Sequence, residues 1–293
     1  MMKKILFVAN VNKDKNLLLS KEVVLTLSNS SCEVYVDVNE LVIEGKVQLV
    51  SNKTLKQIDL MVVLGGDGTI LTYARKYEKY ALPIMGINLG RVGALAVTEL
   101  HNFEFYFEEY LKGDYVTVNH LALDGEIIYA SGKTRKFTAY NDIFSHRGMS
   151  PKLLKTNIAV NNSDFSEVYA DGIIVATPVG SSAYNLSAGG PLLSTSSNCY
   201  VITPICPQSK TFTSLVVSKD DEIHLTVGEN VNVAKNENVV IVDGYVEFAL
   251  NANDIVHIKQ SKKSLKMVQF TPQKSLYESV YKTVVSITKK GEK

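Results

Sequence analysis

The segment IDLMVVLGGDGTILTYARKYEKY, residues 58–80, joins an apolar run to a glycine-rich turn and then to a segment with helical spacing. An unbroken run of Leu, Met and Val over residues 60–64 is typical of a parallel strand buried on both faces. The turn reads Gly65-Gly66-Asp67-Gly68-Thr69, and we expect the helix over residues 69–80. A strand, a turn and a helix in this order predict an α/β layer built on a parallel sheet.

The flanking sequence predicts two domains. Further strands are expected at residues 4–10, 33–38 and 82–87, with a helix at 16–27, so residues 1–113 form an α/β domain with a parallel sheet. Short β-type runs separated by Asp124-Gly125, Asn161-Asn162 and Asp243-Gly244 predict a β-rich, sandwich-like domain over residues 114–270. A helix at 275–288 is expected to rejoin residues 271–293 to the first domain. A cleft between the domains is the expected ligand site.

Composition excludes several classes of protein. The 293 residues are 21% charged with a net charge of +1, which argues against a dominant basic surface and a nucleic-acid partner. No run approaches the roughly 18 apolar residues of a membrane span, and the apolar run near the start is too short for a secretory signal. Cys32, Cys199 and Cys206 show no metal-ligand spacing, so we expect buried or inert reduced thiols in a cytoplasmic protein.

The glycine-rich turn has the composition of a phosphate cradle. Glycines lack a Cβ atom and let phosphate oxygens approach the backbone, and the helix that follows offers N–H groups and a positive dipole end. Thr69 is expected to cap that helix. Asp67 would repel phosphates unless it meets a metal ion or accepts a proton from a nucleophile, and both roles belong to phosphoryl transfer. A simple chain reversal is the alternative.

A second constellation, YADGIIVATPVGSSAYNLSAGGPLL, spans residues 169–193. Small residues dominate it after Thr177 and surround a single tyrosine, Tyr184. A flat ring such as adenine or nicotinamide needs a close-fitting slot, backbone hydrogen bonds and an aromatic face. The alternative is a tight turn that enters a helix, capped by Ser181 or Ser182.

A third piece is AYNDIFSHRG, residues 139–148, in which Asn141 and Asp142 end a β-type run. An adjacent amide and carboxylate can read an adenine edge or a ribose diol, or they can form an Asx turn. Arg147 could pair with a phosphate. His146 has no evident partner, and we expect a non-catalytic role for it.

Together with Asn88-Leu89-Gly90-Arg91-Val92-Gly93, these pieces resemble the NAD kinase family, the ATP- or polyphosphate-dependent enzymes that make NADP. The resemblance covers residues 3–270. The glycine-aspartate turn is also found in lipid kinases of the diacylglycerol and sphingosine type. The long element from Thr177 to Pro191 is much more specific.

The resemblance implies that Asp67 is the general base at the 2′-hydroxyl of the adenosine ribose of NAD, which attacks the γ-phosphate of ATP. It implies Mg²⁺, or another divalent cation, held through phosphates rather than by protein ligands, and a homodimer or homotetramer. Phosphates would contact Gly66, Gly68 and Thr69, with Arg147 as a further candidate. NAD would contact Asp67, Gly68, Asn141, Asp142, Asp171, Ser182, Ala183, Tyr184 and Ser187.

The chain departs from the family pattern at three places. Asp142 stands where the family usually has glutamate, so its contact would be longer or mediated by water. Ala94 stands where the family often has phenylalanine, which would widen that part of the pocket. Val179 and Ser182 replace the more usual threonines, and of these two only Ser182 keeps the hydroxyl.

Two other functions fit parts of the pattern. A lipid kinase would share the glycine-aspartate turn and would need an exposed apolar entrance for acyl chains. A non-catalytic regulator would bind NAD or NADP without turnover, although a pure binder gains nothing from Asp67 beside phosphates.

Overall fold

The computed structural model describes residues 2–90, 93–161, 163–209, 212–228 and 238–270, which form two compact units. The first unit holds the described residues up to Asn119 together with residues 265–270, and the second unit is His120–Ser264. The helix expected at 275–288, and the 271–293 segment as a whole, lie outside the described residues. The division at residues 113 and 114 stays a prediction.

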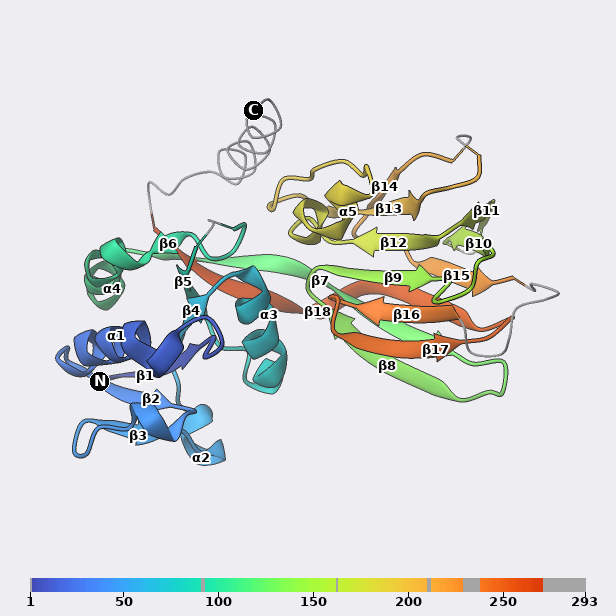
Figure 1. The fold of residues 1–293 in the computed structure, drawn as a ribbon. Helices are drawn as coiled ribbons and strands as arrows, with labels where there is room; N and C mark the ends of the chain where they lie inside the picture. Colours follow the sequence, from blue (N-terminus) through green and yellow to red (C-terminus); the bar gives the residue numbers. More distant parts are fainter. Residues whose placement is uncertain (1, 91–92, 162, 210–211, 229–237, 271–293) are drawn as a thin grey trace, which may run out of the picture. The chain divides into compact units, whose positions relative to one another are not determined.

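The first unit contains the predicted parallel sheet, in the strand order β5-β4-β1-β2-β3 (Figure 1). Its central strands are apolar along almost their whole length, and Val8 of β1 pairs with Val63 of β4. This confirms the α/β class of the N-terminal part. The strands are β1 (Lys3–Ala9), β2 (Cys32–Val36), β3 (Val47–Leu49), β4 (Leu60–Gly65), β5 (Ile84–Asn88) and the short β6 (Thr98–Glu99), which pairs with β5.

Helices cover this sheet: α3 packs against β4 and β5, α1 against β2, and α4 against β6. Stacked rings along α4 bury its inner face, with the centroids of Phe103 and Phe107 5.6 Å apart. The α-helices are α1 (Leu18–Ser28), α2 (Asn52–Leu55), α3 (Asp67–Lys76) and α4 (Phe103–Lys112). The 3₁₀ turns are η1 (Lys15–Leu17), η2 (Asn39–Leu41), η3 (Glu78–Tyr80) and η4 (Leu100–Asn102).

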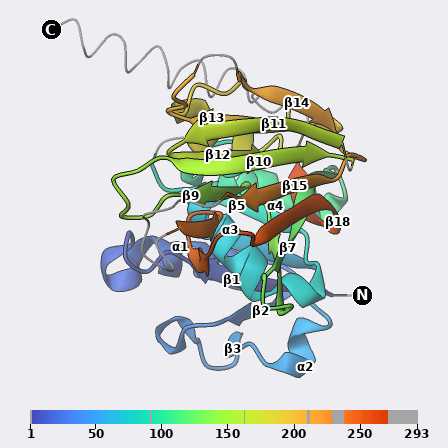
Figure 2. The same cartoon turned by 90° about the vertical axis from the view of Figure 1, so that its right-hand side faces the viewer.

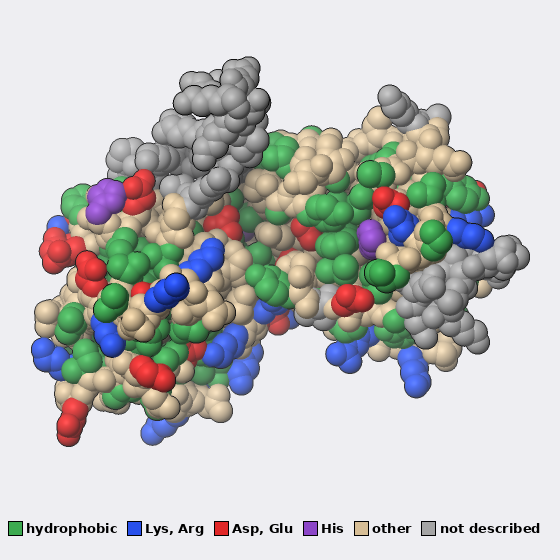
Figure 3. Space-filling view, viewed as in Figure 1, with side chains coloured by type: hydrophobic (Ala, Val, Ile, Leu, Met, Phe, Trp, Pro, Cys, Tyr) green, Lys and Arg blue, Asp and Glu red, His purple; other side chains and the backbone are tan. Residues whose placement is uncertain are grey.

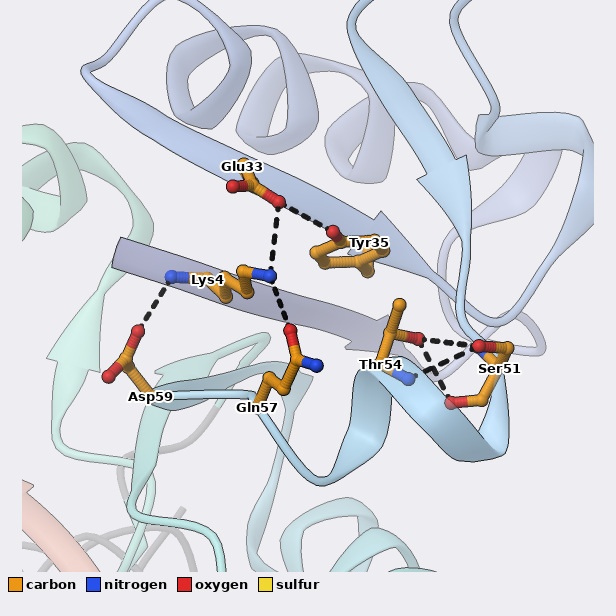
Figure 4. Close-up of polar contacts among 7 residues, drawn as sticks. All are labelled: Lys4, Glu33, Tyr35, Ser51, Thr54, Gln57 and Asp59. Carbon is orange, nitrogen blue, oxygen red and sulfur yellow. Dashed lines mark hydrogen bonds and ion pairs between the residues drawn. The ribbon is translucent and has the colours of Figure 1, made fainter. Parts of the chain in front are cut away.

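Lys4 joins neighbouring parts of the sheet at the start of β1 (Figure 4). Its backbone N–H donates to the Asp59 carboxylate at 2.8 Å, just before β4 begins. Its ammonium group donates to Gln57 and lies 3.6 Å from Glu33 on β2, which accepts a hydrogen bond from the hydroxyl of Tyr35. These contacts hold β2 and the entry to β4 in register on either side of β1.

The second unit is built from antiparallel strands, as predicted for the C-terminal part. One sheet has the order β14-β13-β12-β9-β16-β17, and β11, β10, β15 and β18 are neighbours in the other, with β7 beside β18 and β8 beside β7. Figure 2 shows β10, β11 and β15 side by side. Side chains from both sheets, such as Ile173, Tyr200, Leu225 and Val256, form one buried core.

The elements that lie wholly or mostly in this unit have the following bounds. Its strands are β7 (Val116–Ile128), β8 (Thr134–Ala139), β9 (Asp142–His146), β10 (Leu154–Val160), β11 (Ser163–Ala170), β12 (Gly172–Ala176), β13 (Cys199–Ile205), β14 (Leu215–Ser218), β15 (Ile223–Val227), β16 (Asn238–Val242), β17 (Val246–Leu250) and β18 (Ile255–Gln269). Two short helical segments, η5 (Gly180–Ser182) and α5 (Tyr184–Ser187), lie between β12 and β13.

The structure corrects one predicted turn and confirms another. Strand β7 runs straight through Asp124-Gly125, because Asp124 accepts a hydrogen bond from Thr138 of β8 and the missing side chain of Gly125 makes room for the Phe137 ring. Asp243-Gly244 is the predicted hairpin turn between β16 and β17, with φ of 48° and 70°. Positive φ at both central residues is the geometry of a tight hairpin.

Basic and acidic side chains of the described residues are intermixed on the face drawn in Figure 3. No helix in the described part of the chain is long and apolar enough to span a membrane. The three cysteines are free thiols; Cys32 and Cys199 are partly buried and Cys206 is exposed.

Candidate active site

The glycine-rich turn lies at the point where the strand order of the first unit reverses. From β1 the chain moves to β2 on one side, and from β4 it moves to β5 on the other. Ligands of open α/β sheets bind at the carboxyl ends of the strands beside such a point. Asn10 follows β1 there, its N–H donates to the Leu64 carbonyl at 3.0 Å, and its amide donates to the Thr69 hydroxyl at 3.3 Å.

Asp67 is the first residue of α3, and its carboxylate is held by backbone N–H groups of a different segment. Oδ2 accepts from Ala94 at 2.7 Å, and Oδ1 accepts from Leu95 at 3.1 Å and from Ala96 at 2.9 Å. Gly93 packs directly against this carboxylate, because a Cβ atom at that position would lie 2.2 Å from Oδ1. The carboxylate is therefore fixed in orientation before any substrate arrives, and its side chain is only half-buried.

Gly66 and Gly68, on either side of Asp67, leave backbone groups open to a ligand. Gly66 is the residue before the helix, its backbone is extended, and a side chain there would meet open space. The first carbonyl to accept within α3 is that of Gly66, from Thr69 and Ile70, so the N–H groups of Asp67 and Gly68 precede the helical ladder and suit an external anion.

Thr69 is not the cap that we expected, because it lies inside the first turn of α3. Its side chain is buried against Gly65, where a Cβ atom would lie 2.4 Å from the Thr69 hydroxyl oxygen. The hydroxyl instead accepts from the Asn10 amide, and so links the β1 and β4 loops.

In the second unit, Asn141 stands between β8 and β9, and Asp142 is the first residue of β9, so the pair does not end a strand as expected. The expected β-type run is broken at Tyr140 and Asn141, and Asp142 begins β9. Asp243 causes the break: its carboxylate accepts hydrogen bonds from the N–H groups of Tyr140, Asn141 and Asp142, the shortest at 2.6 Å from Asn141. The side-chain oxygen of Asn141 is buried and has no hydrogen-bond partner among the described residues.

Asp142 is a buried carboxyl group beside a second carboxylate. Its burial, and next the negative charge of Asp243, raise the pKa of Asp142 from 3.8 to about 7. Both causes disfavour the charged form. Asp142 therefore changes its protonation state near neutral pH, which an exposed aspartate does not do.

The small-residue segment meets Asn141 through its backbone. The N–H of Thr177 donates to the Asn141 carbonyl at 2.8 Å, and the Thr177 hydroxyl donates to the Tyr140 carbonyl at 2.8 Å. Gly180 lies against the same carbonyl of Asn141, where a Cβ atom would be only 2.0 Å from the oxygen. This contact is one physical reason for a glycine in the segment.

Tyr184 presents a partly exposed ring at the start of α5. The residue is 37% exposed, and its ring lies edge-on to Phe144 of β9, with the centroids 5.0 Å apart. Ser182 uses its hydroxyl within the turn, where it donates to the Val179 carbonyl, and Ser187 is exposed. Burial, and then the charges of Cys206, Asp171 and Asp142, raise the pKa of Tyr184.

Arg147 and Asp171 form an ion pair with each other. The Arg147 Nε donates to Asp171 Oδ1 at 2.6 Å, its backbone N–H donates to the Asp171 carbonyl, and its Nη1 donates to the Ser150 carbonyl. His146 does have a partner, since its Nδ1 accepts the Gly148 N–H at 3.0 Å. Burial, and then the charge of Arg147, lower the pKa of His146.

The structure thus groups the predicted residues into two sets. Gly66, Asp67, Gly68 and Thr69 lie at the switch point of the first unit, and the other predicted residues lie in the second unit. Sequence reasoning missed Asp243, because an Asp-Gly pair is fully explained as a hairpin turn. No group of three or more His, Cys, Asp or Glu placed to hold a metal ion occurs among the described residues.

Both halves of the chain match family models. The ATP-NAD kinase N-terminal domain matches residues 5–115, and the ATP-NAD kinase C-terminal domain matches residues 140–270. A NAD kinase of Thermoanaerobacter sp. (strain X514) is 34% identical over 276 residues, covering 92% of this chain and 94% of its own. A NAD kinase of Lachnoclostridium phytofermentans is 34% identical over 270 residues, with the same coverage.

Solved structures of similar fold come from the same group of enzymes. Yeast NADH kinase complexed with NADH superposes with a TM-score of 0.83 at 25% identity, covering 92% of this chain and 84% of its own. An NAD kinase from Archaeoglobus fulgidus in complex with ATP has a TM-score of 0.73 at 23% identity, covering 96% and 99%, and shows the shared fold. With both family domains matched and relatives above 30% identity over nearly the whole chain, this chain belongs to the ATP-NAD kinase family.

Proposed function

We propose that this enzyme transfers the γ-phosphate of ATP to the 2′-hydroxyl of the adenosine ribose of NAD, giving NADP and ADP. The observation that carries the proposal is the Asp67 carboxylate, held by three N–H groups at the switch point of the first unit. A carboxylate fixed in this way needs no reorganisation when it accepts a proton. Its place at the first turn of a helix also puts it beside N–H groups that favour phosphate.

In the proposed reaction, Asp67 accepts the proton of the 2′-hydroxyl as that oxygen attacks the γ-phosphorus. A bond forms between the ribose oxygen and the phosphorus, and the bond from the phosphorus to the β–γ bridging oxygen breaks, so that ADP leaves with the electron pair. The N–H groups at the start of α3, with Gly66 and Gly68, hold phosphate oxygens. Thr69 adds only the hydrogen of its hydroxyl, because its N–H donates to the Gly66 carbonyl. Arg147, although paired with Asp171, keeps further guanidinium N–H groups for a phosphate.

Recognition of NAD is assigned to the second unit. Asn141, with its buried and unpartnered amide oxygen, and Asp142 read the nucleoside part. Tyr184 offers a ring face, and Asp171, Ser182, Ala183 and Ser187 complete the dinucleotide contacts. We assign Asp67 and Gly68 a further contact with the NAD ribose.

We propose that a divalent cation, Mg²⁺, accompanies ATP and is held chiefly by phosphate oxygens, because these are the hard oxygen ligands that Mg²⁺ takes at nucleotide sites. When bound, Mg²⁺ supplies charge neutralisation to the phosphates. A polyphosphate offers the same phosphoryl chemistry as a donor. The free thiols of Cys32, Cys199 and Cys206 suit a reducing compartment, and we propose a cytoplasmic homodimer or homotetramer.

The test is an NADP-formation assay with NAD, ATP and Mg²⁺ on the purified protein, beside Asp67→Asn. Loss of the base should reduce turnover by about 10²–10⁴ while NAD binding stays near normal. Unchanged turnover in the variant would remove Asp67 as the base. Bound NAD without NADP formation by the wild type would indicate a regulator, and absence of both would direct the search to lipid substrates.

A further inference from the structure

Asp243 makes contacts that a hairpin turn does not require. It lies at the turn between β16 and β17, is only 6% exposed, and has a φ of 48°. A turn of this geometry accepts asparagine or glycine equally well. The carboxylate, however, accepts hydrogen bonds from the N–H groups of three successive residues that lie about a hundred positions earlier in the chain.

Asp243 contacts residues 140–142, the segment that we assigned to bind the dinucleotide. Oδ1 accepts from Tyr140 at 3.1 Å, from Asn141 at 2.6 Å and from Asp142 at 3.1 Å, and Oδ2 accepts from Tyr140 at 3.1 Å. In the opposite direction, the Asp243 N–H donates to the Asp142 carbonyl at 2.9 Å. Hydrogen bonds to an ionised acceptor are stronger than neutral ones, so this segment is held in one conformation.

We propose that Asp243 is a positioning residue for NAD: its carboxylate fixes the backbone of residues 140–142, and so places the Asn141 amide and the Asp142 carboxyl for the dinucleotide. The inference rests on the proposed function, since it assigns Asp243 to the NAD side of that reaction. Asp243 acts through Asn141 and Asp142 and is not itself a catalytic residue.

The negative charge of Asp243 also affects the protonation of Asp142, and so the pH dependence of NAD binding. The titratable groups that face Asp142 are Asp243, from the β16–β17 turn, and Tyr184, from α5, while its cross-strand neighbour on β12 is the apolar Ala176. The negative charge of Asp243 favours the protonated form of Asp142. A ribose diol donates its hydroxyl hydrogens to an ionised carboxylate, so NAD should bind more tightly as pH rises and Asp142 loses its proton.

The experiment compares Asp243→Asn with a matched control, Asp254→Asn, in the full chain. Asp254 is 2% exposed, lies in the same unit, and also accepts backbone N–H groups, from Ala130 and Asn251. Asparagine keeps the shape of Asp243 and one acceptor oxygen, but removes the charge. The measurements are KM for NAD, KM for ATP, the dependence of NAD affinity on pH, and thermal unfolding.

For Asp243→Asn we expect KM for NAD to rise about 10–100-fold, the range for losing hydrogen bonds to a charged group, with KM for ATP unchanged. The midpoint of the pH dependence of NAD affinity should fall by about one unit or more, because a like charge has been removed. Asp254→Asn should alter thermal unfolding and leave the ratio of the two KM values at the wild-type value. Asp243→Glu, which keeps the carboxylate, should recover part of the NAD affinity.

Equal changes in both KM values, or the same pattern in Asp254→Asn, would overturn the inference and leave Asp243 a structural residue. If Asp243→Asn does not fold, the Asp243→Glu variant decides: a selective rise in KM for NAD supports positioning, and wild-type values contradict it. A wild type that forms no NADP overturns the proposed function. If the wild type forms NADP and Asp243→Asn has the same KM values as the wild type, this inference is overturned and the proposed function stands.

Discussion

A methyl group on Gly93 would lie 2.2 Å from Oδ1 of Asp67, so glycine is the residue that leaves room for this carboxylate. The backbone φ of Gly93 does not lie in the left-handed region, and space alone sets the requirement. The three residues that follow Gly93 donate their N–H groups to the same carboxylate. Gly93 and the three residues that follow it therefore orient the proposed base together.

Gly93→Ala should displace Asp67 and lower turnover by about 100-fold, the cost of a misplacement of roughly 1 Å at a reacting group. KM for NAD should change much less than kcat, and both are read from initial-rate kinetics. Gly228→Ala is the matched control, because a Cβ there is also crowded, 2.6 Å from Cγ of Lys155, but lies in the second unit against a residue without an assigned role in the site. An unchanged kcat in Gly93→Ala would contradict the prediction that Gly93 sets the position of Asp67.

Tyr184→Ala should weaken NAD binding by roughly 1–3 kcal/mol, because it removes a partly exposed aromatic face that packs on Phe144. Calorimetric titration with NAD measures the effect directly. Tyr169→Ala is a suitable comparison, since Tyr169 is similarly exposed, at 40%, on β11. A dissociation constant that does not change in Tyr184→Ala would take this ring out of the dinucleotide site.

The raised pKa of Asp142 predicts a specific pH dependence of stability. The folded protein binds this proton more tightly than the unfolded chain, whose aspartate titrates near 3.8, so the stabilisation is present below that pH and is lost as pH rises through about 7. Relative to Asp142→Asn, the wild type should lose about 4 kcal/mol of unfolding free energy across this interval. Urea unfolding of both proteins at several pH values provides the measurement, and parallel curves would contradict it.

Thr177→Val should destabilise the second unit. The Thr177 hydroxyl donates to the Tyr140 carbonyl and accepts the Gly180 N–H, and valine would remove both of these buried hydrogen bonds, at a cost of about 1–3 kcal/mol each. Thr156→Val provides the control. Thr156 is equally buried, and among the described residues its hydroxyl has no partner, so valine there should be neutral or stabilising. Denaturant midpoints that fall equally in both variants would contradict this account.

Sequence patterns predicted the parts of the fold that local chemistry determines. The apolar run before the glycine-rich turn is β4, and the alternation of strands and helices gave the parallel sheet. The short β-type runs expected over residues 114–270 include the segments that form β12 and β16. The motif order led to the NAD kinase resemblance, which both family models confirm.

Long-range contacts explain what the sequence did not predict. Asp124-Gly125 has the composition of a turn, yet pairing with β8 keeps β7 extended there. Thr69 has the chemistry of a cap, but its hydroxyl is taken up by Asn10 from another loop. Asp243 contacts the Asn141 segment only because β16 pairs with β9, which no local pattern reveals. The assigned roles of the site residues stay predictions.

The path of the chain through the two units has a consequence for biosynthesis. The first unit is interrupted after Asn119 and resumes at Leu265, where Met267 of β18 pairs with Ile84 of β5. When Met267 leaves the ribosome, every residue of the second unit has already been synthesised. Because domains generally fold as units during synthesis, the second unit can fold while the sheet of the first still lacks this strand. The ribosome therefore supplies every residue of the second unit before it supplies the last strand of the first unit.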